Sequence, residues 1–338
     1  MLMRRTLLNP PRTTGGEAAW PSTDPAAPGS PEDGRPPCDS LAAPAVAEER
    51  RRPFFRPRRG WFRRLERAGS RWAARNFFPR VPGLTLIYDG ILRRQLTLSE
   101  AEIELPALPQ AFDGLRLLLI TDVHAGPFVS RRALVHAFRH LTALKPDLIL
   151  LGGDLTTGRV NEFAANREAF DLLQAPLGVF AVMGNHDYYN QRPDDLMRAV
   201  EAAGIPMLQN RSVELRRDGQ SLSLAGVDDL LLGRPDLEAA LAGTRPPVVL
   251  LSHNPDMFFD AARADVALVL SGHTHAGQVR VPGLPVLVRQ SRYRLDEGRY
   301  RVGRTELVVS RGLGAVGVPI RANCPPEVVL LRLRRAAG

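Results

Sequence analysis

The sequence predicts an α/β fold for the chain from about residue 84 onward. Short apolar runs with β character alternate there with helical patterns, which is typical of α/β proteins. Farther along the chain, Asp218-Gly219 lies between two such runs and predicts a β-hairpin. Polar clusters directly follow several of the predicted strands. Together these observations favour a mixed, layered sheet structure.

The alternation places the expected elements in order. The first half predicts strands at 117–120, 147–151 and 179–183 and helices at 131–144, 162–173 and 194–203. The second half predicts strands at 213–216, 222–224, 248–251, 266–270, 307–309 and 328–331. A length of 338 residues permits one large domain or two ordinary ones, so the architecture rests on this pattern.

Composition divides the chain into three parts. Residues 1–50 are rich in Pro, Gly, Ala and Ser with little periodic apolar content, so we expect them to be disordered. Residues 51–80 form a basic segment, and residues 84–335 form the main folded domain. The net charge of +9 is local, because residues 50–80 contain twelve Arg and one Glu, a charge of +11 that leaves −2 elsewhere. The folded body is therefore nearly neutral.

The basic segment predicts an amphipathic helix over residues 61–78. Apolar side chains, Trp61 and Trp72 among them, project from one side, while Arg64, Arg71 and other Arg residues fill the opposite side. Such a helix suits an anionic membrane surface, where Arg meets the headgroups and Trp enters the interface. The sequence leaves open the alternative that this apolar face packs on the folded domain. Nucleic-acid binding through the Arg residues is disfavoured by the same apolar face.

The cysteines and the apolar stretches of the sequence indicate the cellular compartment of the protein. The two cysteines, Cys38 and Cys324, suggest neither a disulfide framework nor a cysteine-based zinc site, which makes a reducing compartment the default. Leu7 and Leu8 run directly into Asn9, leaving no apolar core for an export signal, and no stretch approaches the ~20 apolar residues of a membrane span. We expect a cytoplasmic protein, peripheral on the inner face of the membrane.

Five polar clusters follow predicted strands, where loops leave an α/β sheet and side chains can converge on one crevice. Five of the seven histidines lie in them. The other two, His136 and His140, have the i, i+4 spacing of a zinc-protease pair but lack the glutamate base, so a solvated helix face is the better interpretation. The clusters are Asp122-Val123-His124, Gly153-Asp154, Gly184-Asn185-His186-Asp187, Ser252-His253 and Gly272-His273-Thr274-His275.

The residue types in these clusters predict a site for two divalent metal ions. Carboxylate, imidazole and amide ligands without thiolate favour Mn²⁺, Fe²⁺ or Zn²⁺ over a site for Mg²⁺ alone. In extended backbone, Asp122 and His124 would point to one face and reach one ion. The carboxylate of Asp154 has two oxygens that can bridge ions ~3.5–4 Å apart.

In this order, the five clusters resemble the signature of the calcineurin-like metallophosphoesterases, over roughly residues 115–333. The resemblance implies a four-layer α/β sandwich with two mixed β-sheets, and makes residues 84–335 the catalytic domain. Two departures, Ala125 and Ala276, remove no ligand but could reshape the pocket.

Carried over by position, the resemblance assigns one metal to Asp122, His124, Asp154 and His275. It assigns the other to Asp154, Asn185, His253 and His273, so that Asp154 bridges. His186 would act as general acid or stabilise the transition state, with Asp187 orienting it. A purely structural role for His186 stays open.

The resemblance implies a hydrolase that cleaves phosphodiester or pyrophosphate bonds by attack of a metal-bridging hydroxide. Segments 252–256, 310–314 and 320–327 are similar to a bacterial branch of phosphodiesterases and cell-envelope phosphoesterases, including a Chlamydia-type UDP-2,3-diacylglucosamine pyrophosphatase of lipid A biosynthesis. The alternatives are a phosphodiesterase for small soluble diesters and a non-catalytic membrane-associated scaffold. The oligomeric state is left open.

Overall fold

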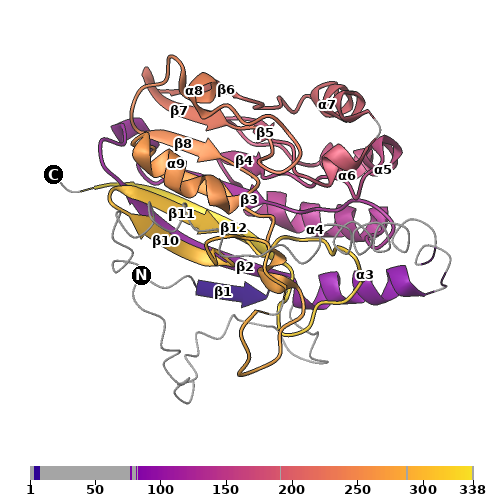
Figure 1. Ribbon diagram of the computed structural model, residues 1–338. Coiled ribbons are helices and arrows are strands. Elements are labelled where there is room, and N and C mark those ends of the chain that lie inside the picture. The colour runs from indigo at the N-terminus through magenta and orange to yellow at the C-terminus, as the bar shows by residue number, and fades with distance from the viewer. Residues whose placement is uncertain are drawn as a thin grey trace, which may run out of the picture.

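The computed structural model describes residues 4–7, 77, 81, 83–190, 192–286 and 288–336. Its first sheet has six strands and mixed pairing (Figure 1). β3, β4 and β5 run parallel, β12 is antiparallel to β3 and parallel to β2, and β1 is antiparallel to β2. In spatial order the strands are β1 (Arg4–Leu7), β2 (Thr97–Leu105), β12 (Glu327–Arg335), β3 (Arg116–Ile120), β4 (Leu148–Leu151) and β5 (Val179–Ala181).

The second sheet also has six strands. Its four central strands are parallel, and an antiparallel strand closes each edge. In spatial order they are β10 (Gly298–Val302), β11 (Thr305–Val309), β9 (Leu268–Ser271), β8 (Val248–Leu251), β7 (Gln220–Gly226) and β6 (Arg211–Arg217). The hairpin predicted at Asp218-Gly219 joins β6 to β7.

The helices form two groups. In Figure 1, α3 to α7 lie together on the right of the view, whereas α8 and α9 lie beside strands of the second sheet. They are α3 (Leu84–Gln95), α4 (Arg131–Ala143), α5 (Val160–Ala165), α6 (Arg167–Phe170), α7 (Pro193–Glu201), α8 (Leu237–Leu241) and α9 (Phe258–Arg263).

Three hydrophobic cores separate four layers. Alternate residues of β3 divide between the first two cores: Leu118 packs with helices α3 to α7, and Leu119 packs against the second sheet. The third core lies between the other face of the second sheet, represented by Leu250, and helix residues such as Phe258. Because strands buried on both faces need apolar side chains on both, β3 and β4 are continuous apolar runs. The predicted four-layer sandwich with two mixed sheets is confirmed.

Several expected elements differ in detail. The single helix expected at 162–173 is two helices, α5 and α6, because Asn166 lies outside helical geometry and its side chain donates to the Glu162 carbonyl at 2.8 Å. Helix α3 and strand β2 were not predicted as elements. Exposed Leu86 and Ile87 beside buried Tyr88 and Leu92 obscure the helical period of α3.

The expectation of disorder over residues 1–50 is wrong for residues 4–7, which form β1 and pair with β2 from Arg4↔Glu100 to Leu7↔Thr97. The rest of that segment lies outside the described residues, as does the amphipathic helix expected over 61–78 apart from residue 77.

Candidate metal centre

The five polar clusters lie just beyond strands, in the order the sequence predicts. Asp122 and His124 follow β3, Asp154 follows β4, and Asn185 follows β5. In the second sheet, the cluster of His253 follows β8 and the cluster of His273 and His275 follows β9. Because these strands are parallel within each sheet, their carboxyl ends share one edge, and the loops of both sheets meet there.

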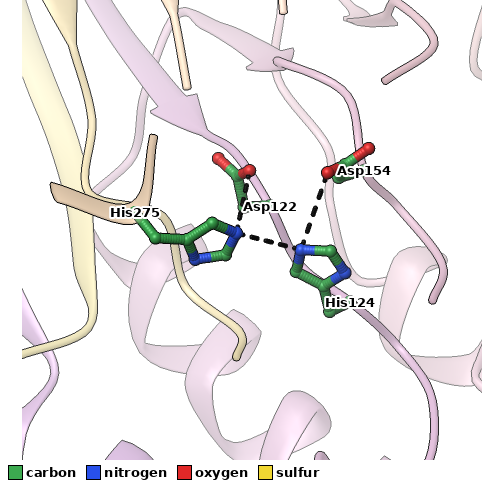
Figure 2. Close-up of side chains that lie close together, drawn as sticks. All are labelled: Asp122, His124, Asp154 and His275. Carbon is green, nitrogen blue, oxygen red and sulfur yellow. Dashed lines mark hydrogen bonds and ion pairs between the residues drawn. The ribbon is translucent and has the colours of Figure 1, made fainter. Parts of the chain in front are cut away.

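Four of the predicted ligands form one compact buried group. Asp122, His124, Asp154 and His275 each offer a ligand atom, and these atoms lie within 4.8 Å of one another. Figure 2 shows the four side chains pointing toward a common centre. The Nε2 atom of His275 lies 3.1 Å from Nε2 of His124 and 3.3 Å from Oδ1 of Asp122, and Nε2 of His124 lies 3.6 Å from Oδ2 of Asp154. This is the set predicted for one metal.

Of the remaining predicted ligands, His253 contacts Asp154 and His273 lies beside His253. Nε2 of His253 lies 3.3 Å from Oδ2 of Asp154, and the rings of His253 and His273 are 5.0 Å apart. Within the part of the chain that the structure describes, Oδ1 of Asn185 and both ring nitrogens of His273 are buried without a hydrogen-bond partner. Unsatisfied buried polar atoms are costly, and a cation would satisfy these ligand-type atoms. The donor set therefore fits the binding of metal ions.

The backbone of these clusters is left-handed at most of the ligand positions. Asp122, His124, Asp154, His273 and His275 have φ values of 51°, 45°, 51°, 72° and 49°. The expectation that Asp122 and His124 share one face of extended backbone is therefore wrong, since both residues have left-handed backbone. Positive φ is unfavourable for residues other than Gly, and such strain gathers at functional sites.

Two glycines allow the carboxylates to approach the backbone. A Cβ on Gly184 would lie 2.2 Å from Oδ1 of Asp154, and one on Gly272 would lie 2.2 Å from Oδ2 of Asp122. Both positions therefore exclude any side chain while the carboxylates keep their places. The Gly residues of the two motifs are thus part of the packing of the centre.

Burial and neighbouring charges set the protonation of the metal-free site. Burial lowers the pKa of His124 and of His273 to about 3, so both imidazoles are neutral, the form that binds metal. Burial alone would lower the pKa of His253, but the carboxylate of Asp154 outweighs it and raises that pKa to about 10. Burial alone would raise the pKa of Asp154, but the charges of His253 and His186 hold it well below its usual value. Asp154 is therefore ionised in the metal-free site.

The two residues expected to carry catalysis lie beside Asp154. The backbone N–H of His186 donates to Oδ1 of Asp154 at 2.7 Å, and the His186 ring is 4.7 Å from the ring of His124. Asp187 is buried and accepts four hydrogen bonds, from the Gly184 and Leu155 amides and from the amide and hydroxyl of Thr156. Asp187 thus ties the loop after β4 to the loop after β5 and fixes the backbone that carries His186.

Comparison with known proteins identifies the family. The calcineurin-like phosphoesterase family matches residues 115–277. "Uncharacterized metallophosphoesterase YkuE" of Bacillus subtilis is 30% identical over 243 residues, which cover 70% of this chain and 85% of that protein. "Phosphodiesterase YaeI" of Escherichia coli is 33% identical, covering 64% of this chain and 82% of that protein.

The chain belongs to the calcineurin-like phosphoesterases. This membership supports the expected enzyme class, a hydrolase acting on phosphoester bonds, and the buried ligand group supports divalent metal cofactors. "Transmembrane protein with metallophosphoesterase domain" of Danio rerio is 34% identical over 252 residues, or 70% of this chain, and the chain spans 57% of that protein's length. None of the helices that the structure describes here is long and apolar enough to cross a membrane.

One group beside this calcineurin-like centre was not expected to take part in it. Arg321 is buried, and its Nη2 lies 3.0 Å from Nδ1 of His275, 2.8 Å from the Arg311 carbonyl and 2.6 Å from the Gly314 carbonyl. The thiol of Cys324 donates to the His275 carbonyl at 3.2 Å. In the sequence, Arg321 and Cys324 belong to the segments that resemble the bacterial branch and were given no other role. The signal that could have identified Arg321 is its position as a charged residue between the apolar residues Ile320 and Ala322.

The other predicted residues lie apart from the centre or outside the description. His136 and His140 face each other on α4 with ring centroids 4.4 Å apart, as expected for residues on one helix face. The residues proposed for membrane contact, Trp61, Arg64, Arg71 and Trp72, lie outside the described residues.

Proposed function

We propose that this chain hydrolyses phosphodiester or pyrophosphate bonds with two divalent metal ions, which are Mn²⁺, Fe²⁺ or Zn²⁺. The observation that carries the proposal is the position of Asp154, whose Oδ2 lies 3.6 Å from His124 on one side and 3.3 Å from His253 on the other. A carboxylate between two imidazole groups is suited to bridging two ions.

One ion would be held by Asp122, His124, Asp154 and His275, and the other by Asp154, Asn185, His253 and His273. Bound there, such ions supply Lewis acidity and neutralise charge on the phosphoryl oxygens. The protein keeps these ligands dry and fixed, since all seven side chains are buried. The left-handed backbone at five of the seven positions and the close glycines constrain their directions.

His186 is proposed to face the scissile phosphate and to protonate the departing oxygen or stabilise the transition state. Its ring lies beside the ring of His124, close to the first ligand group. Asp187 positions it through the backbone, because its carboxylate holds the amide of Gly184, two residues before His186. General acid catalysis of this kind contributes about 10²–10⁴-fold to rate.

For the substrate we propose a lipid-linked phosphoester at the inner face of the membrane, with a UDP-2,3-diacylglucosamine-type pyrophosphate of lipid A synthesis as the candidate. Support comes from the similarity of segments 252–256, 310–314 and 320–327 to that bacterial branch and from the amphipathic pattern over 61–78. Trp61, Arg64, Arg71 and Trp72 would make the membrane contact, with residues 84–335 as the catalytic domain.

The competing substrate class is small soluble diesters, which the name of the Escherichia coli phosphodiesterase also fits. Turnover of a lipid-nucleotide pyrophosphate and of an activated aryl diester should be compared on the purified chain with added Mn²⁺. The proposal expects both to be hydrolysed and the lipid substrate to be preferred. Preference for the soluble diester would remove the lipid assignment, and hydrolysis of neither would favour the non-catalytic scaffold.

A further inference from the structure

The exposed apolar residues of the folded domain are concentrated on two neighbouring loops. One loop joins β9 to β10 and the other joins β11 to β12; we call the segments 279–286 with Val288 and 316–320 the rim loops. They carry six of the large hydrophobic side chains that are exposed to solvent: Val279, Val281, Leu284, Val288, Val318 and Ile320. The longer loop projects in orange from the lower part of the molecule in Figure 1.

Hydrogen bonds join the rim loops into one surface. The Gln278 side chain donates to the carbonyls of Val316 and Val318, both at 3.0 Å, and accepts from the amide of Val316 at 2.8 Å. Val279 forms a parallel bridge with Ala322, flanked by the bond from the Arg280 amide to the Ala322 carbonyl at 2.8 Å. The two loops therefore present their side chains together, as a patch held in place by backbone pairing.

The rim loops lie close in sequence to the residues of the metal centre. Val279 lies four residues after the candidate ligand His275, and a Cβ on Gly277 would lie 2.5 Å from Cγ1 of Val286. On the other loop, a Cβ on Gly314 would lie 2.8 Å from Cβ of His124. The apolar patch thus adjoins the loops that hold the first ligand group.

The charge beside the patch is net positive. Residues 279–297 include four Arg and two acidic residues, Asp296 and Glu297. Arg280 and Arg289 form ion pairs with Glu297 and Asp296, whereas Arg292 and Arg294 are exposed. Aliphatic side chains at a loop surface with flanking Arg are complementary to an anionic bilayer, into which the apolar groups insert while Arg meets the headgroups.

We propose that the rim loops dock on an anionic membrane, as a second contact that goes beyond the one proposed for residues 61–78. Docking by these loops places the metal centre at the headgroup level, where a phosphoester attached to a lipid would present its phosphate. The contact is a property of the folded domain and does not depend on catalysis.

Co-sedimentation of the full chain with vesicles of phosphatidylcholine, alone or mixed with phosphatidylglycerol, tests this proposal. The double variant Leu284→Ser with Ile320→Ser should bind the mixed vesicles about tenfold more weakly than the parent, because two aliphatic side chains no longer enter the bilayer. The matched control is Leu231→Ser with Leu232→Ser on the loop after β7. Leu231 is 53% exposed and Leu284 is 55% exposed, but Leu231 lies on the loop after β7 and Leu284 on the loop between β9 and β10.

The control should bind as the parent does, and both variants should keep parent turnover of a soluble aryl diester, which shows that the fold is intact. A fluorophore on Leu284→Cys in a Cys38→Ser background should shift to the blue on mixed vesicles, and one on Leu231→Cys should not. The proposal would be overturned if the Leu284→Ser, Ile320→Ser variant bound vesicles as tightly as the parent, or if the fluorophore at position 284 showed no blue shift. If sedimentation shows that the parent self-associates and the Leu284→Ser, Ile320→Ser variant does not, while both bind vesicles equally, the patch is a contact between copies of this chain and the proposal is wrong.

A parent chain without diesterase activity would count against the proposed function. The vesicle and fluorescence results would still decide the docking proposal. Thermal melting curves of the variants would then replace turnover as the check that the fold is intact.

Discussion

The guanidinium of Arg321 donates a hydrogen bond to Nδ1 of His275 over 3.0 Å. Nδ1 must accept, because a guanidinium has only donors. The same guanidinium holds the carbonyls of Arg311 and Gly314, so the ring of a candidate ligand is fixed to the loop that follows β11. With Nδ1 accepting, the neutral ring carries its proton on Nε2, and this proton must leave before that atom can bind a metal ion.

We predict that Arg321→Met lowers the free energy of unfolding by about 2–5 kcal/mol. The substitution leaves Nδ1 of His275 and two buried carbonyls without their donor. Urea unfolding of the metal-free protein measures the effect independently of turnover. Arg304→Met, at an exposed position between β10 and β11, is the control and should change stability by no more than about 0.5 kcal/mol. Unchanged stability in Arg321→Met would show that the loop after β11 keeps its place without this guanidinium.

Gly184→Ala should displace Asp154, since the added Cβ would lie 2.2 Å from its Oδ1. Overpacking of this kind costs typically about 1–3 kcal/mol in the free energy of unfolding, and metal should be lost with it. Gly90→Ala in α3 is the control: no atom lies within 4 Å of the added Cβ, so the helix should gain about 0.5–1 kcal/mol. Denaturant unfolding of both variants checks this, and equal stabilities would contradict the packing described here.

Asp187→Ala should destabilise the chain by about 3–5 kcal/mol, because it leaves three buried backbone amides and the Thr156 hydroxyl without their acceptor. The exposed Asp171, paired with Arg167 on α6, provides a control whose replacement by Ala should change stability by no more than about 0.5 kcal/mol. Urea unfolding distinguishes the two. A small effect at Asp187 would mean that the loops after β4 and β5 hold together without it.

The buried carboxylate of Glu306 should make the free energy of unfolding depend on pH. Burial opposes its charge, but Arg299 at 2.7 Å and Arg301 lower its pKa below the ordinary value of 4.5. A lowered folded pKa contributes stability that is present above the unfolded pKa and is lost as pH falls through the folded pKa. Glu306→Gln should therefore cost about 2 kcal/mol at pH 7 and progressively less below about pH 4.5. A cost that does not change with pH would contradict this assignment.

The fold was predictable where burial leaves a repeating pattern. The runs at 117–120 and 248–251 read as strands because both faces of each are covered, which keeps every position apolar. Helix α3 escaped prediction because its first turn exposes Leu86 and Ile87, so the apolar residues do not keep to one face. The split at Asn166 depends on one side-chain hydrogen bond that has no periodic signature.

The candidate ligands were predictable because their motifs are local and lie at strand ends. Their geometry was not, since alternation along an extended strand cannot foresee the positive φ of Asp122 and His124. Arg321 was missed as a partner of His275 because 46 residues separate the two and only the folded loops bring them together. Long-range contacts of this kind leave no pattern in the spacing of residues along the sequence.

The most direct test of the two-metal account is the metal content of two purified variants, Asp154→Ala and His186→Ala, measured beside the parent. Asp154 is the carboxylate between both sets of ligands, whereas His186 is proposed to act on the substrate and its backbone amide donates to Asp154. We predict that Asp154→Ala loses bound metal and that His186→Ala keeps the parental content of two ions per chain while losing about 10²–10⁴-fold in turnover. Full metal loading of Asp154→Ala would contradict the account.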